Sequence, residues 1–298
     1  SAWWLAIRPA TLTASAAPVL VGAGAAWAEG KFALGPALAA LLGASLLQVG
    51  ANFSNDVFDF ERGADTADRL GPQRATQQGW VTAEQMKRAM WLAFAGATAV
   101  GLYLTYVAGW PVLALGLLSI AAAYLYTGGP KPYGYLGLGD LAVFLFFGFG
   151  AVAGTYYVQA HTVSQLALVA SIPIGALATA ILVVNNLRDI ETDARAGKHT
   201  LAVRLGDRPT RTYYFALLAV AYLVPVGLWW RGLSLMGMRF VRGRRPFPSI
   251  RRIKLTQVTA YFIIILCLRN RQDLEQFVVN RLTPAPGVGR IHTSLVLT

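Results

Sequence analysis

Two clusters of acidic side chains contain the residues of this sequence best suited to chemistry. Asn55 and Asp59 are four positions apart, as are Asp189 and Asp193, so each pair lies on one face of a helix. Mg²⁺ prefers hard oxygen ligands and typically takes one or two carboxylates plus phosphate oxygens of a substrate. Without a cation, the carboxylates would repel one another and lose hydration at a membrane edge. The two pairs therefore predict divalent-metal sites that hold a diphosphate between them.

Basic side chains lie near these clusters. Arg74 and Lys198 flank them, and Lys131 is the only basic residue in the linker that follows Tyr126. Lysine contacts phosphate oxygens as a point charge, whereas arginine contacts them as a fork. We expect these three residues to bind an anionic substrate, although each could instead reflect the excess of basic residues on one membrane face.

The composition indicates the surroundings of these residues. Of 298 residues, 55% are hydrophobic and only 13% are charged, with a mean hydropathy of +0.49. Soluble domains carry about 25% charged residues. The single cysteine, Cys267, excludes an intrachain disulfide and a cysteine-rich metal site. The composition therefore predicts an all-α, polytopic transmembrane helix bundle.

Apolar runs of nearly membrane-spanning length recur along the chain, and a span needs about 20 residues. Seven clear spans are expected. They are Thr11–Ala28, Leu34–Asn55, Met86–Ala108, Trp110–Tyr126, Leu138–Ala160, Gln165–Asn186 and Tyr213–Trp230.

The charges give these spans an orientation. Twelve basic residues lie in or beside the linkers after the second, fourth and sixth spans, whereas Lys31 stands alone in the other linkers. We expect a multi-pass protein of the cell (inner) membrane. By the positive-inside rule, its N-terminus and both acidic clusters lie on the cytoplasmic side. The net charge of +12 then follows from topology and contact with anionic lipid, and it requires no nucleic-acid partner.

The same topology allows the acidic clusters to meet. Ten of the 14 acidic residues lie in the linkers after the second and sixth spans, and four spans separate these linkers. For any single aspartate, the simpler interpretation is a solvated residue that balances a nearby arginine. Two helically spaced pairs at the ends of two spans favour function instead.

Several motifs that occur in order give the sequence a family likeness. It resembles the UbiA superfamily of intramembrane aromatic prenyltransferases, and in particular its menaquinone branch. The matching segments are Asn55-Asp56-Val-Phe-Asp59-Phe-Glu-Arg-Gly-Ala-Asp65-Thr, Arg69-Leu-Gly-Pro-Gln-Arg74, Tyr126-Thr-Gly-Gly-Pro-Lys131-Pro with Leu-Gly-Asp140, and Asn186-Leu-Arg188-Asp189-Ile-Glu-Thr-Asp193 followed by Gly197-Lys198. One common form of the first motif has an aspartate where this chain has Gly63, and here the acid is Asp65.

The resemblance implies a bundle of eight or nine helices around a central cavity open to the lipid, with Mg²⁺ as cofactor. It implies metal ligands at Asn55, Asp56, Asp59, Asp65, Asp189 and Asp193. The expected substrate-binding residues are Asn55, Arg74, Tyr126, Lys131, Arg188 and Lys198. The expected catalytic residues are Asp59, Asp189, Asp193 and Lys131.

The implied reaction is prenyl transfer from a polyprenyl diphosphate to an aromatic acid, with 1,4-dihydroxy-2-naphthoate as the expected acceptor. Positive groups around the diphosphate favour cleavage of the allylic C–O bond, and an apolar cavity keeps water from the carbocation. One alternative is the same chemistry with another acceptor, such as 4-hydroxybenzoate. Another is a cation or phosphate transporter, which usually places its site near the bilayer midplane rather than at span ends.

The resemblance covers roughly residues 3 to 230. We therefore expect a transmembrane core over residues 1–230 and an atypical basic segment over 231–298, which holds 12 of the 26 basic residues. Within that segment, Leu255–Leu268 is apolar but short, which suits a partial span or an interfacial helix.

Overall fold

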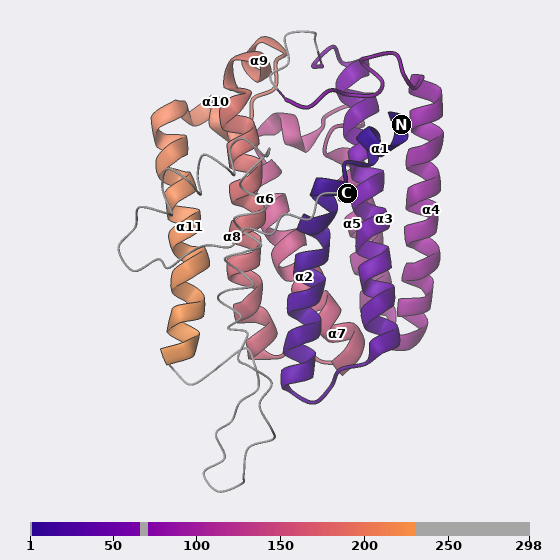
Figure 1. The fold of residues 1–298 in the computed structure, drawn as a ribbon, viewed down its shortest axis with the longest axis vertical. Coiled ribbons are helices and arrows are strands. Elements are labelled where there is room, and N and C mark those ends of the chain that lie inside the picture. The colour runs from indigo at the N-terminus through magenta and orange to yellow at the C-terminus, as the bar shows by residue number, and fades with distance from the viewer. Residues whose placement is uncertain (1, 66–70, 231–298) are drawn as a thin grey trace, which may run out of the picture. The chain divides into compact units, whose positions relative to one another are not determined.

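The fold is an all-helical bundle in a computed structural model that describes residues 2–65 and 71–230 (Figure 1). These residues contain no β-strand and belong to one compact unit. The longer helices are α2 (Pro9–Ala28), α3 (Leu34–Glu61), α4 (Ala83–Ala108), α5 (Trp110–Leu125), α8 (Gln165–Arg188) and α11 (Asp207–Trp230). The shorter elements are α1 (Ala2–Ile7), η1 (Tyr133–Leu136), α6 (Gly139–Val143), η2 (Phe144–Ala153), α7 (Gly154–Ala160), α9 (Ile190–Arg195) and α10 (Leu201–Leu205).

The predicted helical spans are helices in the structure. Elements α6, η2 and α7 follow without a break and together form the expected fifth span, with a π-helix in the middle. Five helical stretches are long and apolar enough to cross a membrane, namely Ala2–Ala28, Leu34–Glu61, Ala83–Ala108, Gly139–Ala160 and Gln165–Arg188. Trp110–Leu125 is a shorter apolar helix, and α11 is not among the five. The possible span Leu255–Leu268 lies outside the described residues.

Local sequence signals set the helix ends. The Thr82 side chain accepts a hydrogen bond from the Gln85 backbone, and the Gln85 side chain accepts one from the Thr82 backbone, which forms a capping box before α4. Ser164 caps α8 by accepting from the Ala167 N–H. Gly109 separates α4 from α5 with a φ of 85°, a conformation that favours glycine. These signals fix where α4 and α8 begin and where α4 ends.

Small residues allow the helices to approach closely. A Cβ atom added to Gly22 of α2 would lie 2.3 Å from the Val152 carbonyl oxygen, and one added to Gly175 of α8 would lie 2.7 Å from the Phe144 carbonyl oxygen. Such contacts between backbones are typical of helices packed in lipid. They bring α2 and α8 against the π-helical segment.

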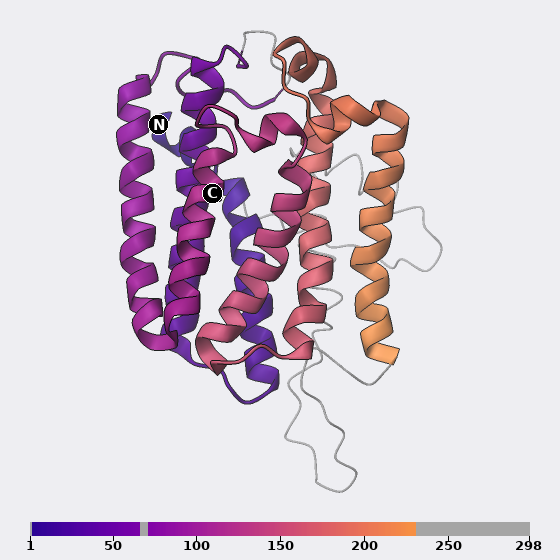
Figure 2. The ribbon, with the colours of Figure 1, turned by 180° about the vertical axis from the view of Figure 1, so that it is seen from behind.

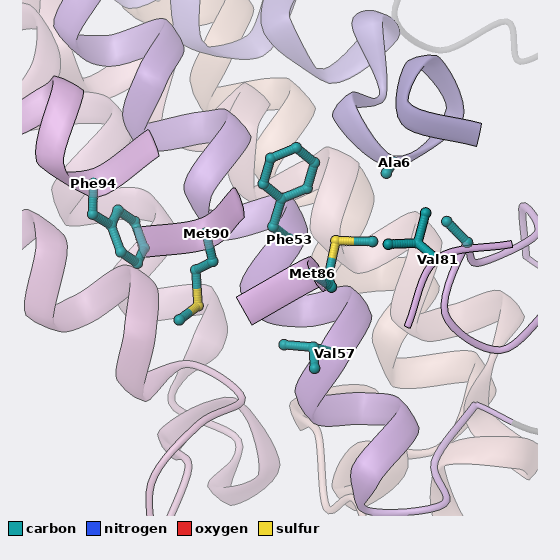
Figure 3. Packing of buried hydrophobic residues seen from close by; sticks show 8 residues of the cluster. Ala6, Phe53, Val57, Val81, Met86, Met90 and Phe94 are labelled. Atoms are coloured by element: carbon teal, nitrogen blue, oxygen red, sulfur yellow. The ribbon is translucent and has the colours of Figure 1, made fainter. Parts of the chain in front are cut away.

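Apolar packing fixes the end of α3 that carries the first acidic cluster. Phe53 and Val57 of α3 contact Met86, Met90 and Phe94 of α4, and all five side chains are at least 95% buried (Figure 3). Close van der Waals packing of these side chains holds α3 against α4. Asp56, between Phe53 and Val57, and Asp59, two residues after Val57, therefore lie on a firmly packed part of α3.

The chain runs up and down the bundle, so the C-terminal ends of α3, α5 and α8 lie at the same end, together with η1 and α9 (Figures 1 and 2). We call this the acidic end. At the opposite end, the turn between α2 and α3 is attached to α7. The buried Tyr156 hydroxyl donates to Glu29, and the Lys31 Nζ donates to the Tyr156 hydroxyl at 3.3 Å.

Candidate active site

The first acidic cluster surrounds a buried arginine. The Arg74 Nη2 atom lies 3.3 Å from Asp59 Oδ2, and its Nε lies 3.2 Å from Asp65 Oδ2. All three side chains are at least 94% buried, so two carboxylates and one guanidinium share a site from which water is largely excluded. The Arg74 Nη1 atom is also buried and has no hydrogen-bond partner among the described residues. The cluster thus retains an unused donor suited to an anion.

Asp56 has a different environment, although it lies on the same turn of α3. Its two carboxylate oxygens accept hydrogen bonds from the backbone N–H groups of Ala75, at 3.1 Å, and Thr76, at 3.0 Å. It is 1% exposed. Its metal role stays a prediction, whereas its contacts show that it attaches the linker carrying Arg74 to α3.

Asn55 and Arg62 connect α3 to the linker after α5. The Thr127 hydroxyl donates to Asn55 Oδ1 at 3.0 Å. Arg62 donates from Nε to the Thr127 carbonyl oxygen at 3.1 Å and from Nη2 to the Gly129 carbonyl oxygen. These bonds place the segment between Tyr126 and Lys131 beside the first cluster.

The second cluster begins where α8 ends. Asp189 is the C-cap of α8 and receives a bidentate ion pair from Arg188. Asp193 Oδ1 lies 3.7 Å from the Lys198 Nζ, and the Lys198 N–H donates to the Asp193 carbonyl oxygen at 2.8 Å. Each predicted metal ligand of this cluster thus has a basic partner within the chain.

Tyr135, on η1, connects the two clusters. Its hydroxyl donates to Asp59 Oδ1 at 2.9 Å, and the Lys198 Nζ lies 5.4 Å from the centre of its ring. The Tyr135 carbonyl oxygen accepts from the His199 N–H at 3.0 Å. Burial, reinforced by the Asp59 carboxylate, raises the pKa of the Tyr135 phenol, so the phenol stays protonated and acts as a donor.

Sequence reasoning missed Tyr135. The available signal was its place in Pro132-Tyr-Gly-Tyr135, directly after the predicted anion-binding Lys131. Lys131 itself is exposed, and it forms no ion pair with another described residue. The structure therefore brings together the predicted residues of each cluster, but it does not place Lys131 in contact with either one.

The predicted metal site can be tested against the positions of its ligands. Within residues 2–65 and 71–230, no group of three or more His, Cys, Asp or Glu side chains is arranged to hold a metal ion. The available donors are nevertheless carboxylate and amide oxygens, which suit Mg²⁺ with water and phosphate oxygens as its other ligands. The described side chains alone therefore do not complete a metal site, and Mg²⁺ would need phosphate oxygens and water as further ligands.

An apolar cavity of about 650 Å³ lies inside the bundle, below the acidic end. Asn55, Tyr126 and Asn185 line it from the ends of α3, α5 and α8, and small or apolar residues of α2 to α8 form most of its walls. Tyr126 packs edge-on against Tyr133, with ring centres 5.4 Å apart. A charged site thus adjoins a long apolar space, as an amphiphilic substrate with an anionic head would require.

An apolar helical bundle of this kind, with charged clusters at one end of an internal cavity, defines a membrane-embedded protein whose site suits an amphiphilic anion. Residues 15–241 match the UbiA prenyltransferase family, and the chain belongs to that family. The fold class and the family expected from the sequence are therefore confirmed.

Curated relatives are similar over most of the chain. A protein of Escherichia coli (strain K12) is 44% identical over 223 residues, which cover 73% of this chain and 72% of that protein. One of Mycobacterium tuberculosis is 47% identical over 219 residues, covering 74% and 75% respectively. Both are named 1,4-dihydroxy-2-naphthoate octaprenyltransferase.

Solved structures share the fold. A UbiA homolog from Archaeoglobus fulgidus bound to GPP and Mg²⁺ superposes with a TM-score of 0.61 at 15% identity, over 94% of this chain and 87% of that chain. The archaeal protein without a named ligand gives 0.60 at 14% identity, over 94% of each chain. The helical arrangement is therefore that of the archaeal UbiA homolog.

Proposed function

We propose that this protein transfers a polyprenyl group from a polyprenyl diphosphate to 1,4-dihydroxy-2-naphthoate in menaquinone biosynthesis. The observation that carries this proposal is the junction of the two acidic clusters, joined by Tyr135, with the apolar cavity. The names of the relatives support the choice of acceptor. Residues 1–230 would form the catalytic unit.

The charged groups have distinct roles in this proposal. Asn55 and Asp59 on α3, with Asp189 and Asp193 after α8, would hold Mg²⁺. Asp56 and Asp65 are also predicted ligands, and their contacts with the Ala75 and Thr76 N–H groups and with Arg74 support the first cluster. When bound, Mg²⁺ supplies positive charge that stabilises the departing diphosphate. The Arg74 Nη1, which has no hydrogen-bond partner among the described residues, is suited to donate to a diphosphate oxygen, and Arg188, Lys198 and Lys131 add positive charge around it.

The reaction then follows from the position of the cavity. The allylic C–O bond breaks, the diphosphate keeps the bonding electrons, and the apolar walls keep water from the carbocation. The acceptor ring supplies an electron pair to form the new C–C bond. Its carboxylate leaves as CO₂ and returns an electron pair to the ring, so no base is needed at that carbon.

We also propose that the acidic end faces the cytoplasm of the cell membrane. Twelve basic residues support this orientation through the positive-inside rule. Labelling of single introduced cysteines at exposed positions of the two ends, such as Thr162 and Glu191, in a Cys267→Ala background tests it. A membrane-impermeant reagent applied from outside should label the Thr162→Cys protein in intact cells and leave the Glu191→Cys protein unlabelled.

The function is tested with detergent-purified protein, Mg²⁺ and octaprenyl diphosphate, supplied with either 1,4-dihydroxy-2-naphthoate or 4-hydroxybenzoate. We expect prenylated, decarboxylated product from the naphthoate, detected by mass spectrometry. If only 4-hydroxybenzoate gave product, the acceptor would be 4-hydroxybenzoate and not the naphthoate. Product from neither acid, while a relative of established activity works in parallel, would refute the proposal.

A further inference from the structure

Two groups of helical glycines differ in what surrounds them. At Gly22, Gly148 and Gly175, an added Cβ would meet backbone atoms of a neighbouring helix within 3 Å, so close helix packing requires them. At Gly101 of α4 and Gly116 of α5, an added Cβ would meet no atom within 4 Å. Both of these glycines line the apolar cavity. Helix packing therefore does not explain them.

Helix propensity does not explain them either. Glycine inside a helix is about 1 kcal/mol less favourable than alanine. Neither Gly101 nor Gly116 has a positive φ that would favour glycine. What the two positions share is the empty space in front of them, which any larger side chain would occupy.

The two glycines lie at the same depth. Gly101 precedes the end of α4 at Ala108, and Gly116 follows the start of α5 at Trp110. With a rise of 1.5 Å per residue, both are about 10 Å from the end of the bundle opposite the acidic end. Gly116 is about 15 Å along α5 from Tyr126, which lies at the acidic end. A ligand whose head lies at the acidic end meets these glycines only if it is long.

We propose that Gly101 and Gly116 set the length of the prenyl chain that the protein accepts. This inference rests on the proposed function, since it takes the occupant of the cavity to be the prenyl tail of the donor. The tail runs from the acidic end past both glycines, and the missing side chains leave room for its distal units. A short donor ends before it reaches them.

The test compares the wild-type protein with Gly116→Leu and Gly24→Leu, using geranyl and octaprenyl diphosphate as donors. Gly24 is an exposed glycine of α2 whose added Cβ also meets no atom within 4 Å, but it does not line the cavity. It is therefore a matched control for leucine in place of an unpacked helical glycine.

We expect Gly116→Leu to lower kcat/KM for octaprenyl diphosphate by roughly tenfold or more, because the leucine and the distal prenyl units would occupy the same space. The use of geranyl diphosphate, measured as donor or as competitor, should stay within about twofold of wild type, since the short tail does not reach the leucine. Gly24→Leu should leave both donors unchanged. Gly101→Leu provides the same test if Gly116→Leu does not fold.

The assignment of chain length to these glycines would be overturned if kcat/KM fell equally for both donors in the folded cavity variant. It would also be overturned if Gly116→Leu and Gly24→Leu changed kcat/KM equally. Either result would leave the proposed function intact. If the wild-type protein used no prenyl diphosphate at all, the proposed function itself would fail, and this inference with it.

Discussion

The hydroxyl of Tyr135 donates a 2.9 Å hydrogen bond to the buried carboxylate of Asp59, and the Lys198 ammonium lies 5.4 Å from the centre of the same ring. One residue of a linker thus contacts both the α3 cluster and the segment after α9. Because hydrogen bonds to a charged group contribute about 1.5–3 kcal/mol, the contact is strong enough to orient Asp59.

Replacing Tyr135 by phenylalanine should therefore lower catalysis without unfolding the protein. We expect kcat to fall roughly tenfold, the equivalent of about 1.4 kcal/mol, and the Mg²⁺ concentration for half-maximal activity to rise, because Asp59 loses a fixed orientation. Tyr106→Phe is the matched control, since Tyr106 is 89% exposed. An unchanged Mg²⁺ response in Tyr135→Phe would contradict this role for the tyrosine.

Asp56 and Asp59 should respond differently to the same change. Asp59→Asn should abolish turnover with the fold retained, because Asp59 is proposed to serve chemistry. Asp56→Asn places an NH₂ group opposite a backbone N–H, so it should cost about 1–3 kcal/mol of stability. Thermal unfolding and Mg²⁺ titration of activity separate the two effects. If the Asp56→Asn protein were stable but needed more Mg²⁺ for half-maximal activity, Asp56 would act as a metal ligand and not as a structural contact.

Removal of divalent metal should stop catalysis but leave the fold in place. The acids that would hold Mg²⁺ already have basic partners, Arg74 beside Asp59 and Arg188 beside Asp189, so each of these carboxylates keeps a cation beside it when the metal is removed. We expect a chelator to abolish product formation, excess Mg²⁺ to restore it, and the unfolding temperature to change little. Unfolding on chelation would show that the metal is structural.

Arg74 should matter to stability as well as to substrate binding. Its removal leaves Asp59 and Asp65 buried without their cation, which typically costs about 3–5 kcal/mol. Arg88→Ala is the control. It removes an exposed i, i+4 pair with Glu84, where about 0–1 kcal/mol is expected. Similar unfolding temperatures for the Arg74→Ala and Arg88→Ala proteins would contradict the buried ion triad.

The first cluster could be predicted because its spacing is local. Asn55 and Asp59 share a helix face whatever the rest of the chain does. The second pair does not share one continuous helix as expected, because Asp189 lies at the break between α8, which ends at Arg188, and α9, which begins at Ile190. The end of α3 was less predictable, since the helix continues from Asn55 to Glu61 past the apolar run. Apolarity marks where lipid contact ends, whereas the helix continues because its polar residues are buried against Arg74 and the linker.

Contacts between distant parts of the chain could not be read from local pattern. Tyr135 acts on Asp59 only because the linker after α5 lies against the end of α3. Arg74 could be predicted as a base near the clusters, but its pairing with Asp59 and Asp65 depends on the fold of its own linker. Likewise, Tyr156 meets Glu29 from a helix far along the sequence.

Asp56 binds the following linker through two backbone N–H groups, those of Ala75 and Thr76. The hydrogen bonds therefore do not restrict the side chains at these two positions, and other contacts decide which residues are tolerated there. Ala75 packs in the apolar cluster of α3 and α4, which restricts its size. The Thr76 hydroxyl is buried without a hydrogen-bond partner among the described residues, so valine should be tolerated there, while proline, which has no N–H, should be excluded.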